Sequence, residues 1–553
     1  MNPRKSPLAA AALLVFLTQS ASLASYHLER ISPVLNQPTY LTQAPGDPAN
    51  ILYYTTRING NSPGYNATNP MGSVWRYDIN TRVSTEVLSM SSRSTVADDG
   101  IQSIAFHPDF NSPGAPGYGK LYVSSATQGT VALNRVEEFT LLDSNGAFKS
   151  VSQVFSTARI ILSYNNSRGN NHTVDWIGFN PNASGAERNY LYISTGDGSF
   201  GNIYNYGYSP DGRPSQNPGD VKGKFLRVDI SGGDDYPTDA SKNFVIPPSN
   251  PIPTYNLAHP SKRISGLGEV YVTGVRNAYR ASFDRANSDL YWGDVGENAY
   301  EEVSFLKAGS NGSGPPVDFG WPQSEGTHDS TISGAPHTTT NPFTGAQSLY
   351  PLQEYSHSIG HAAIGGYVYR GPITELQGKY FYGDFVAGKV WMLDFDRNTD
   401  PTLFAGTNGT LTDVTAIWNA KITDPTTPDY AGDNSIATLG GIDHVVSLGE
   451  DNNGNLYVVD FGYGSGFSGQ YAVNAGEIFM LVPDEYPPTL TWTKSEGGGG
   501  LHFSWFGNYK LQTQTNDVSS ENWSDYPGGG ISPVDVPFDP AQHAVFFRLM
   551  GPP

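Results

Sequence analysis

The stretch SLGEDNNGNLYVVDFG, Ser447 to Gly462, contains the unit on which the fold depends. It is an apolar residue followed by an aromatic, Leu456-Tyr457, in a short strand surrounded by Gly, Asp and Asn. The same kind of pair recurs at Leu52-Tyr53, Leu121-Tyr122, Leu191-Tyr192, Leu290-Tyr291 and Tyr380-Phe381. Six copies of a strand-rich unit predict an all-β chain that closes into a six-bladed β-propeller.

Each copy is followed by a second strand in which apolar residues alternate with polar ones. These strands are SVWRYD (Ser73 to Asp78), VEEFTL (Val136 to Leu141), KFLRVD (Lys224 to Asp229), EVSFLK (Glu302 to Lys307), KVWMLD (Lys389 to Asp394) and EIFMLV (Glu477 to Val482). The six aromatics are 69, 70, 99, 90 and 76 residues apart. A four-stranded blade needs only about 40 to 50 residues, so every unit contains insertions. We expect these insertions to form long loops on one face, where binding residues usually lie.

The composition excludes some classes of partner. The formal net charge is −20, which repels phosphate backbones, so nucleic acid is not expected as a partner. The 553 residues include 62 glycines, 40 prolines and no cysteine. This composition is typical of turns and strands, and a chain without disulfides depends on its core, strand closure or bound ions for stability.

The first 24 residues predict a secretory signal peptide. Arg4 and Lys5 precede an apolar run from Leu8 to Leu17, and small residues end at Ala24. Cleavage after Ala24 would give a secreted or periplasmic protein, whereas an uncleaved N-terminal anchor is the alternative. No later stretch is long and apolar enough to span a membrane.

The point at which the repeat stops predicts the domain boundaries in the C-terminal part of the chain. The propeller is expected over residues 27–483, followed by an acidic, Pro-rich linker at 484–488. Residues 489–553 alternate apolar and polar positions between glycine clusters, which predicts a small β-sandwich-like C-terminal domain. Such a domain could bind carbohydrate or a cell surface, or act as a spacer or sorting tail.

Several longer phrases resemble one family. They are GIQSIAFHPDF (Gly100 to Phe110), NHTVDWIGFNP (Asn171 to Pro181), YISTGDGS (Tyr192 to Ser199), VTGVRNAYRASFD (Val272 to Asp284), LYWGDVGENAYEEVSFL (Leu290 to Leu306) and DFGWPQSEG (Asp318 to Gly326). Together they resemble the glucose/sorbosone dehydrogenase family over about His27 to Pro483. The resemblance implies a six-bladed propeller that uses pyrroloquinoline quinone (PQQ) and Ca²⁺ to oxidise the anomeric carbon of an aldose sugar to a lactone. The electron acceptor stays unknown.

The resemblance also implies roles for individual residues. His172 matches the histidine that takes the proton from the anomeric hydroxyl, and an imidazole suits this role near neutral pH. Arg276 matches an arginine that faces the quinone carbonyl, and a permanently charged guanidinium can stabilise negative charge there. Asn171 and Asn277 match cofactor neighbours, so the expected catalytic residues are His172 and Arg276 and the expected cofactor-binding residues are Asn171, Arg276 and Asn277.

The calcium-binding stretch of the family matches a cluster of acidic residues in this chain, Asp294, Glu297, Glu301 and Glu302. The resemblance implies one ion bound by backbone carbonyls of Gly296 and Glu297, and another bound by the Glu302 carboxylate and the Phe319 carbonyl. Calcium prefers six to eight oxygen ligands of this kind. The alternative to calcium binding is that these acids lie on a surface loop and are solvated.

Two departures from the family pattern concern the cofactor. Thr173, Val174, Asp175 and Trp176 follow the histidine where relatives have glycines, which adds bulk beside the expected quinone. The lysine and arginine that bind the quinone carboxylates in relatives are also missing: Lys389 is displaced, and His444 is the nearby basic candidate. An anionic cofactor then needs Arg263, Arg280 or Arg370.

Two other functions therefore stay open. One is a calcium-stabilised binding propeller without redox chemistry, similar to the dehydrogenase-like domain of hedgehog-interacting proteins, which the two departures favour. The other is lactone hydrolysis, since lactonases also place calcium at the hub of six-bladed propellers.

Overall fold

The computed structural model describes residues 26–57, 69–92, 94–95, 100–127, 132–166, 171–198, 214–312, 314–330, 339–419, 422, 441–462, 475–484, 490–494, 499–505, 509–515, 522–530, 532–537, 539 and 545–550. The predicted signal peptide and most of the predicted linker lie outside these ranges. The domain boundaries therefore stay predictions.

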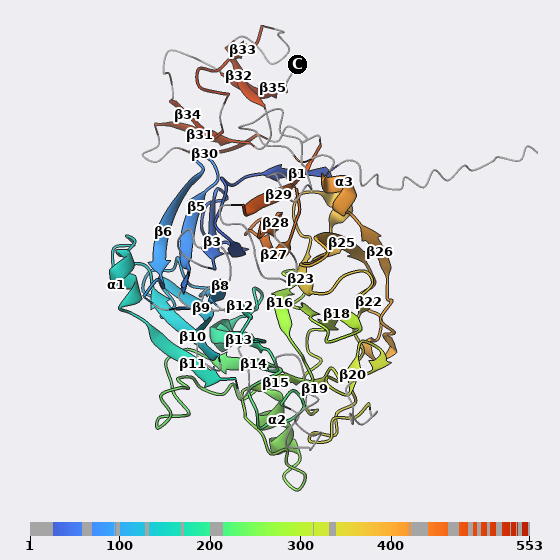
Figure 1. Ribbon diagram of the computed structural model, residues 1–553. Helices are drawn as coiled ribbons and strands as arrows, with labels where there is room; N and C mark the ends of the chain where they lie inside the picture. Colours follow the sequence, from blue (N-terminus) through green and yellow to red (C-terminus); the bar gives the residue numbers. More distant parts are fainter. Residues whose placement is uncertain are drawn as a thin grey trace, which may run out of the picture.

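Six antiparallel sheets surround a common axis, as the repeat predicts (Figure 1). The innermost strands are β2 (Pro38–Thr42), β8 (Gly100–Phe106), β12 (Trp176–Phe179), β16 (Ala278–Phe283), β23 (Ala363–Val368) and β27 (Val445–Glu450). The second strands are β3 (Ile51–Thr56), β9 (Lys120–Thr127), β13 (Tyr190–Thr195), β17 (Leu290–Asp294), β24 (Tyr380–Asp384) and β28 (Leu456–Asp460). We number the sheets as blades 1 to 6 in this order.

The outer half of each blade completes the sheet. The third strands are β5 (Ser73–Asp78), β10 (Leu133–Thr140), β14 (Lys224–Asp229), β18 (Tyr300–Leu306), β25 (Lys389–Asp394) and β29 (Glu477–Pro483). The fourth are β6 (Val83–Ser89), β11 (Arg159–Asn165), β15 (Val270–Thr273), β22 (Gln353–Ser356), β26 (Thr410–Asp413) and β1 (Tyr26–Arg30). The six repeated aromatics all lie on second strands and are buried, so the phrase marks the same position in every blade.

Short elements occupy the insertions. In blade 3, β19 (Val317–Asp318) adds to β15 in parallel. A separate two-stranded sheet contains β20 (Ser324–Glu325) and β21 (His328–Asp329). Another short pair is β4 (Asn69–Pro70) with β7 (Ser94–Thr95). The helices are α1 (Val151–Phe155), α2 (Pro251–Ala258) and α3 (Thr415–Asn419), with 3-10 turns at Gly185–Asn189, Thr374–Leu376 and Pro401–Leu403. None of the helices in the described ranges could cross a membrane.

The N-terminal strand closes the ring. Each innermost strand contacts the next around the axis, and β27 contacts β2. Blade 6 takes three strands from the end of the propeller and its fourth, β1, from the start of the described chain. In this pairing Tyr26 lies opposite Pro483, and Arg30 forms an ion pair of 2.7 Å with Glu477. The N-terminal and C-terminal strands of the propeller are therefore joined by hydrogen bonds within blade 6, without any disulfide.

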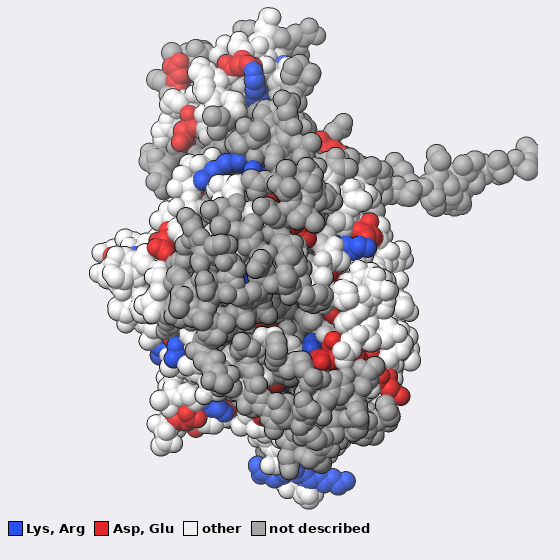
Figure 2. All heavy atoms as spheres, viewed as in Figure 1, with Lys and Arg blue, Asp and Glu red and all other residues white. Residues whose placement is uncertain are grey.

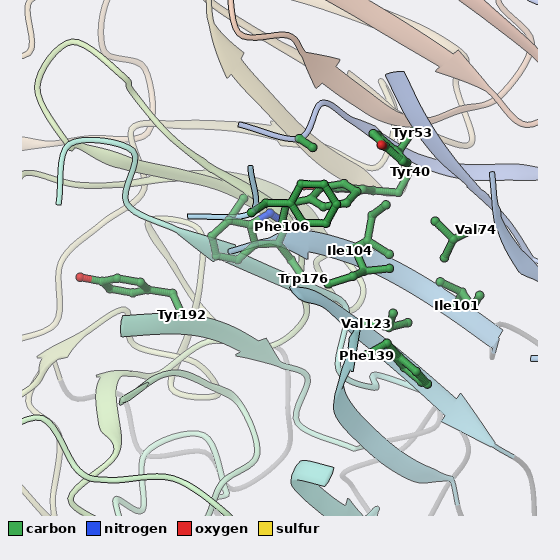
Figure 3. Packing of buried hydrophobic residues seen from close by; sticks show 14 of the residues in the cluster. Tyr40, Tyr53, Val74, Ile101, Ile104, Phe106, Val123, Phe139, Trp176 and Tyr192 are labelled. Carbon is green, nitrogen blue, oxygen red and sulfur yellow. The ribbon is translucent and has the colours of Figure 1, made fainter. Parts of the chain in front are cut away.

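Between blades, aromatic and aliphatic side chains form the core. Figure 3 shows part of one cluster, in which Tyr53 and Phe106 pack with ring centroids 4.5 Å apart. Hydroxyl groups add bonds between neighbouring blades: Thr39 donates to the Ile101 carbonyl at 3.1 Å, and Ser282 donates to the Gly366 carbonyl at 2.6 Å. Small polar residues on the inner strands thus satisfy buried backbone groups while allowing the strands to approach closely.

The C-terminal part forms two small antiparallel sheets outside the ring, next to β1 in Figure 1. One contains β30 (Thr491–Lys494), β31 (Gly500–Ser504) and β34 (Val534–Pro537). The other contains β33 (Ser524–Asp525), β32 (Lys510–Gln514) and β35 (Phe546–Met550). Phe503, Trp505, Leu511 and Val536 are their shared core, which confirms the β-sandwich-like prediction.

Candidate functional site

The predicted site residues come together where blades 3 and 4 meet, at one end of the propeller. His172 precedes the innermost strand β12, and Asp197 follows β13. Arg276 precedes β16, and Glu297 follows β17. Because innermost strands begin and second strands end at the same edge of an antiparallel blade, these four loops share one face.

His172 has a backbone conformation that few non-glycine residues adopt. Its φ is +53°, in the left-handed region, and its Nδ1 lies 2.6 Å from Asp197 Oδ1. The side chain of Asp197 is 1% exposed and that of His172 is 13% exposed. Gly196 permits this arrangement, because a Cβ on Gly196 would lie 2.5 Å from the carbonyl carbon of His172. A strained residue held against a buried acid is typical of a functional site.

Asp197 contacts both sides of the site. Its Oδ2 accepts a hydrogen bond of 2.9 Å from the indole Nε1 of Trp321, and its backbone N–H donates to the Arg276 carbonyl at 2.8 Å. With the carboxylate accepting from Nδ1–H, the His172 ring carries its lone pair on Nε2. This is the geometry of a general base oriented by a carboxylate.

The Arg276 guanidinium is buried beside the dyad. It donates to the Val295 carbonyl at 2.7 Å, forms an ion pair with Glu297, and lies over the Trp321 ring at 5.4 Å from its centroid. Although burial alone disfavours the charge, the Arg276 pKa is raised because the carboxylates of Glu297 and Asp197 are close. Arg276 therefore stays cationic at any pH at which the protein is folded.

Asp294, the last residue of β17, positions the backbone of the next segment. Its carboxylate accepts from the amides of Arg276 at 3.1 Å and Asn277 at 2.6 Å. Burial raises the pKa of Asp294 to about 7 even though these two amides oppose the shift. The carboxylate thus determines the local conformation of the Arg276-Asn277 pair.

The three residues expected to bind the cofactor share one property. Asn171 Oδ1, Arg276 Nε and Asn277 Oδ1 are buried polar atoms without a hydrogen-bond partner in the described part of the chain. Unsatisfied buried polar atoms are rare in folded proteins and call for an explanation such as a bound ligand. Arg276 Nε could donate to a carbonyl oxygen of a ligand, whereas the two amide oxygens could accept from donor groups of a ligand.

The residues expected to bind calcium lie in three places. Gly296 and Glu297 form the loop after β17, and the Glu297 side chain turns toward Arg276. Glu302 lies on β18 opposite Asp294 and accepts from the Gly326 amide at 2.5 Å. Phe319 packs against Trp292, with ring centroids 4.6 Å apart.

Burial and the nearby Asp294 raise the pKa of Glu302 well above its ordinary value. A cation beside this pair of acids would offset that penalty. However, no group of three or more His, Asp or Glu side chains within the described ranges has a metal-binding arrangement. The calcium ligands stay a prediction.

Three residues that the sequence argument did not select complete the site: Asp197, Trp321 and Glu325. Glu325 accepts hydrogen bonds with one oxygen from the amides of Glu297, Asn298, Ala299 and Tyr300, at 2.8 to 3.2 Å. All three lie inside phrases that carry the family resemblance, YISTGDGS and DFGWPQSEG. Their place in these phrases could have identified them as candidate site residues. Their hydrogen-bond partners could not be predicted, because those partners lie far away in the sequence.

The bulky residues after His172 belong to the core. Val174 and Trp176 are buried in separate inter-blade clusters, and Figure 3 shows Trp176 packed within one of them. Trp176 covers Gly178, whose Cβ would lie 2.3 Å from the indole. These side chains are thus accommodated between blades.

The alternative cations have other partners. Lys389 pairs with Asp413 and Arg370 with Asp284, while Arg280 donates to the carbonyls of Asp175 and Thr39 at 3.0 Å across the hub. Arg263 is exposed, and burial lowers the pKa of His444. In Figure 2, acidic and basic side chains of the described residues lie scattered around the rim of the face in view. Lys389, Arg370 and Arg280 are therefore already bound to other groups in the described part of the chain.

Comparisons with known proteins agree with this architecture. Among curated proteins, HIPL2 from Arabidopsis thaliana is 29% identical over 287 residues, and HIPL1 from the same plant is 28% identical. Each match covers 49% of this chain and 36% of the relative, so the chain spans about a third of these relatives' length.

Solved structures support the fold. A glucose dehydrogenase superposes with a TM-score of 0.51 at 14% identity, covering 82% of this chain and 98% of that one. A putative oxidoreductase (glucose dehydrogenase) from Thermus thermophilus gives a TM-score of 0.50 at 16% identity, covering 83% and 100%. The glucose/sorbosone dehydrogenase family matches residues 66–416, which include every predicted site residue. The chain belongs to the glucose/sorbosone dehydrogenase family.

Proposed function

We propose that this protein is an oxidoreductase that oxidises the anomeric carbon of an aldose to a lactone, with PQQ and Ca²⁺ as cofactors. The observation that carries the proposal is the His172–Asp197 dyad beside the cationic Arg276, with Trp321 in contact with both Asp197 and Arg276. A binding surface does not need an imidazole oriented by a buried carboxylate, whereas proton removal from a hydroxyl does.

In this proposal His172 Nε2 accepts the proton of the anomeric hydroxyl, and Asp197 stabilises the imidazolium that forms. Arg276 stabilises negative charge that develops next to it. The quinone, when bound, supplies the acceptor for the hydride of the anomeric C–H bond. Asn171, Arg276 and Asn277 would bind it through their unsatisfied atoms, and the loop at Gly296 and Glu297, with Glu302 and Phe319, would provide the calcium ligands.

The test is dye-linked oxidation of glucose and other aldoses by purified protein supplied with PQQ and Ca²⁺. We expect His172→Ala to lower kcat by roughly 10²- to 10⁴-fold, the usual contribution of a general base. His502→Ala, a histidine in the C-terminal sheets, is the matched control and should leave kcat unchanged. Equal activity of the His172→Ala variant would remove the dyad from the mechanism.

A second candidate is a calcium-stabilised binding propeller without redox chemistry. It is favoured by the ion pair between Glu297 and Arg276, which neutralises the cation that the proposed chemistry uses. The HIPL relatives, whose name gives no activity, are compatible with it. Uptake of Ca²⁺ with no change in PQQ absorbance at any concentration would support this candidate over the first.

The proposal includes export and domain division. Cleavage after Ala24 would release a secreted or periplasmic protein with a propeller at 27–483, a linker at 484–488 and a small domain at 489–553. N-terminal sequencing of the exported protein tests the cleavage site.

A further inference from the structure

Glu297 places a carboxylate on the guanidinium that the proposed chemistry uses. The Arg276 and Glu297 side chains are 9% and 8% exposed, and they form a direct ion pair. The other terminal nitrogen of Arg276 already donates to Val295. An anionic group that approaches Arg276 therefore meets a guanidinium whose charge is already paired with Glu297, although Nε is still without a partner in the described part of the chain.

The position of Glu297 is determined by its loop. Glu325 accepts from the Glu297 amide and from the three amides after it, and Glu301 accepts from the Gly296 amide at 3.2 Å. Gly296 lies so close to Tyr300 that a Cβ would be 1.8 Å from the Tyr300 carbonyl oxygen. A backbone restrained by this many contacts fixes where the Glu297 side chain begins, so its pairing with Arg276 is part of the fold.

The surroundings add to the negative charge. Asp197, Glu301 and Glu325 are buried in the same region, whereas the raised pKa values of the nearby Asp294 and Glu302 favour their neutral forms. In a region of low dielectric constant, an incoming anion is repelled by the first three groups more strongly than it would be in water. Neutral sugars meet no such penalty.

We propose that Glu297 is a specificity-determining residue, a built-in counter-anion of Arg276 that favours neutral ligands and lowers the affinity of the site for anionic ones, including the tricarboxylate PQQ. This inference rests on the proposed function, because it concerns the same site. Removing the charge of Glu297 while keeping its shape should remove the direct ion-pair partner of Arg276, so that the guanidinium attracts an incoming anion more strongly. Close charge pairs couple strongly, so we expect Glu297→Gln to bind PQQ on the order of tenfold more tightly.

The experiment titrates full-length protein with PQQ at constant saturating Ca²⁺, followed by absorbance. Wild type, Glu297→Gln and a control, Glu138→Gln, are compared. Glu138 is matched in type and burial: its side chain is 9% exposed and pairs with Arg159 at 3.0 Å, but it lies on β10 in blade 2. Thermal unfolding verifies that each variant folds, and Glu297→Ala replaces Glu297→Gln if the latter does not.

Tighter binding by the Glu297 variant alone supports the inference. Equal affinity of wild type and Glu297→Gln overturns it but leaves the proposed function in place. Tighter binding without turnover of any aldose keeps the inference and contradicts the proposed function. If neither protein binds PQQ, both are overturned, because the variant is expected to bind.

Discussion

Asp197 serves two neighbours at once: it orients the His172 ring and accepts from Trp321, which also packs on Arg276. The acid therefore links the proposed base to the proposed electrostatic stabiliser. Replacing this acid by asparagine should affect catalysis more than folding, because the amide has the same shape as the carboxylate and still fills the space.

We expect Asp197→Asn to lower kcat by roughly 10²- to 10⁴-fold while KM changes little, since the amide no longer selects the tautomer with its lone pair on Nε2. Steady-state kinetics with the dye-linked assay measures both constants. Differential scanning fluorimetry gives the control, a melting temperature close to that of wild type. A larger effect on KM than on kcat would argue that Asp197 acts in binding.

Lys224, at the start of β14, makes stability depend on pH. Its ammonium is fully buried and donates to the carbonyls of Ser215 and Lys222 at 2.8 Å. Burial lowers the pKa of Lys224 to about 7 from 10.5. Between these two values the unfolded chain binds one more proton than the folded one, so stability rises with pH across this window.

Replacing Lys224 by Met removes this proton difference. The free energy of unfolding of wild type should rise relative to Lys224→Met by about 1.4 kcal/mol per pH unit at most, from about pH 7 to pH 10. Chemical denaturation of both proteins across this pH range measures the difference between their free energies of unfolding. The contributions of the other titrating groups cancel in this difference, because both proteins contain them. Parallel pH profiles would show that Lys224 does not titrate as described.

At the scale of the element, the loop 295–300 depends on one carboxylate. Glu325 belongs to β20 and is buried, with one oxygen accepting from four consecutive amides of this loop. Hydrogen bonds to a charged acceptor are stronger than neutral ones, so this contact stabilises a segment without regular secondary structure.

Glu325→Ala should therefore loosen this loop specifically. We expect amide hydrogen exchange at residues 297–300 to become faster on the order of tenfold, because the lost acceptor leaves these amides to water. Mass spectrometry of deuterium uptake measures this, and β9 in blade 2 provides amides that should not change. Unaltered exchange at 297–300 would mean that other contacts determine the loop.

At the scale of the whole molecule, the ring depends on β1. This strand supplies the outer edge of blade 6, and Arg30 and Glu477 join it to β29 with side chains 10% and 2% exposed. Without Arg30, Glu477 would be a buried carboxylate that has lost its cation.

We expect Arg30→Ala to lower the free energy of unfolding by about 3 kcal/mol or more, which is typical for breaking a buried ion pair from one side. The double variant Arg30→Met with Glu477→Met should recover part of this loss, since no unpaired charge remains. Denaturant titration of the three proteins measures both effects. A loss below about 1 kcal/mol for Arg30→Ala would place this pair among weak surface ion pairs.

The sequence by itself determined the blade. The apolar-aromatic pair and the alternating strand after it are local patterns with a period of two, so Leu456-Tyr457 and EIFMLV identify β28 and β29 without knowledge of distant contacts. The positions of His172, Arg276 and Glu297 on loops next to these strands followed from the family phrases.

Tertiary structure alone decided what those residues touch. Asp197 and Trp321 are 124 residues apart, and Arg280 reaches Thr39 across 241 residues, because packing of blades brings their loops together. The pairing of Glu297 with Arg276 likewise depends on a loop shaped by Glu325, which no local pattern encodes. Strand periodicity is a property of adjacent residues, whereas the chemistry of the hub depends on which loops closure of the ring places side by side.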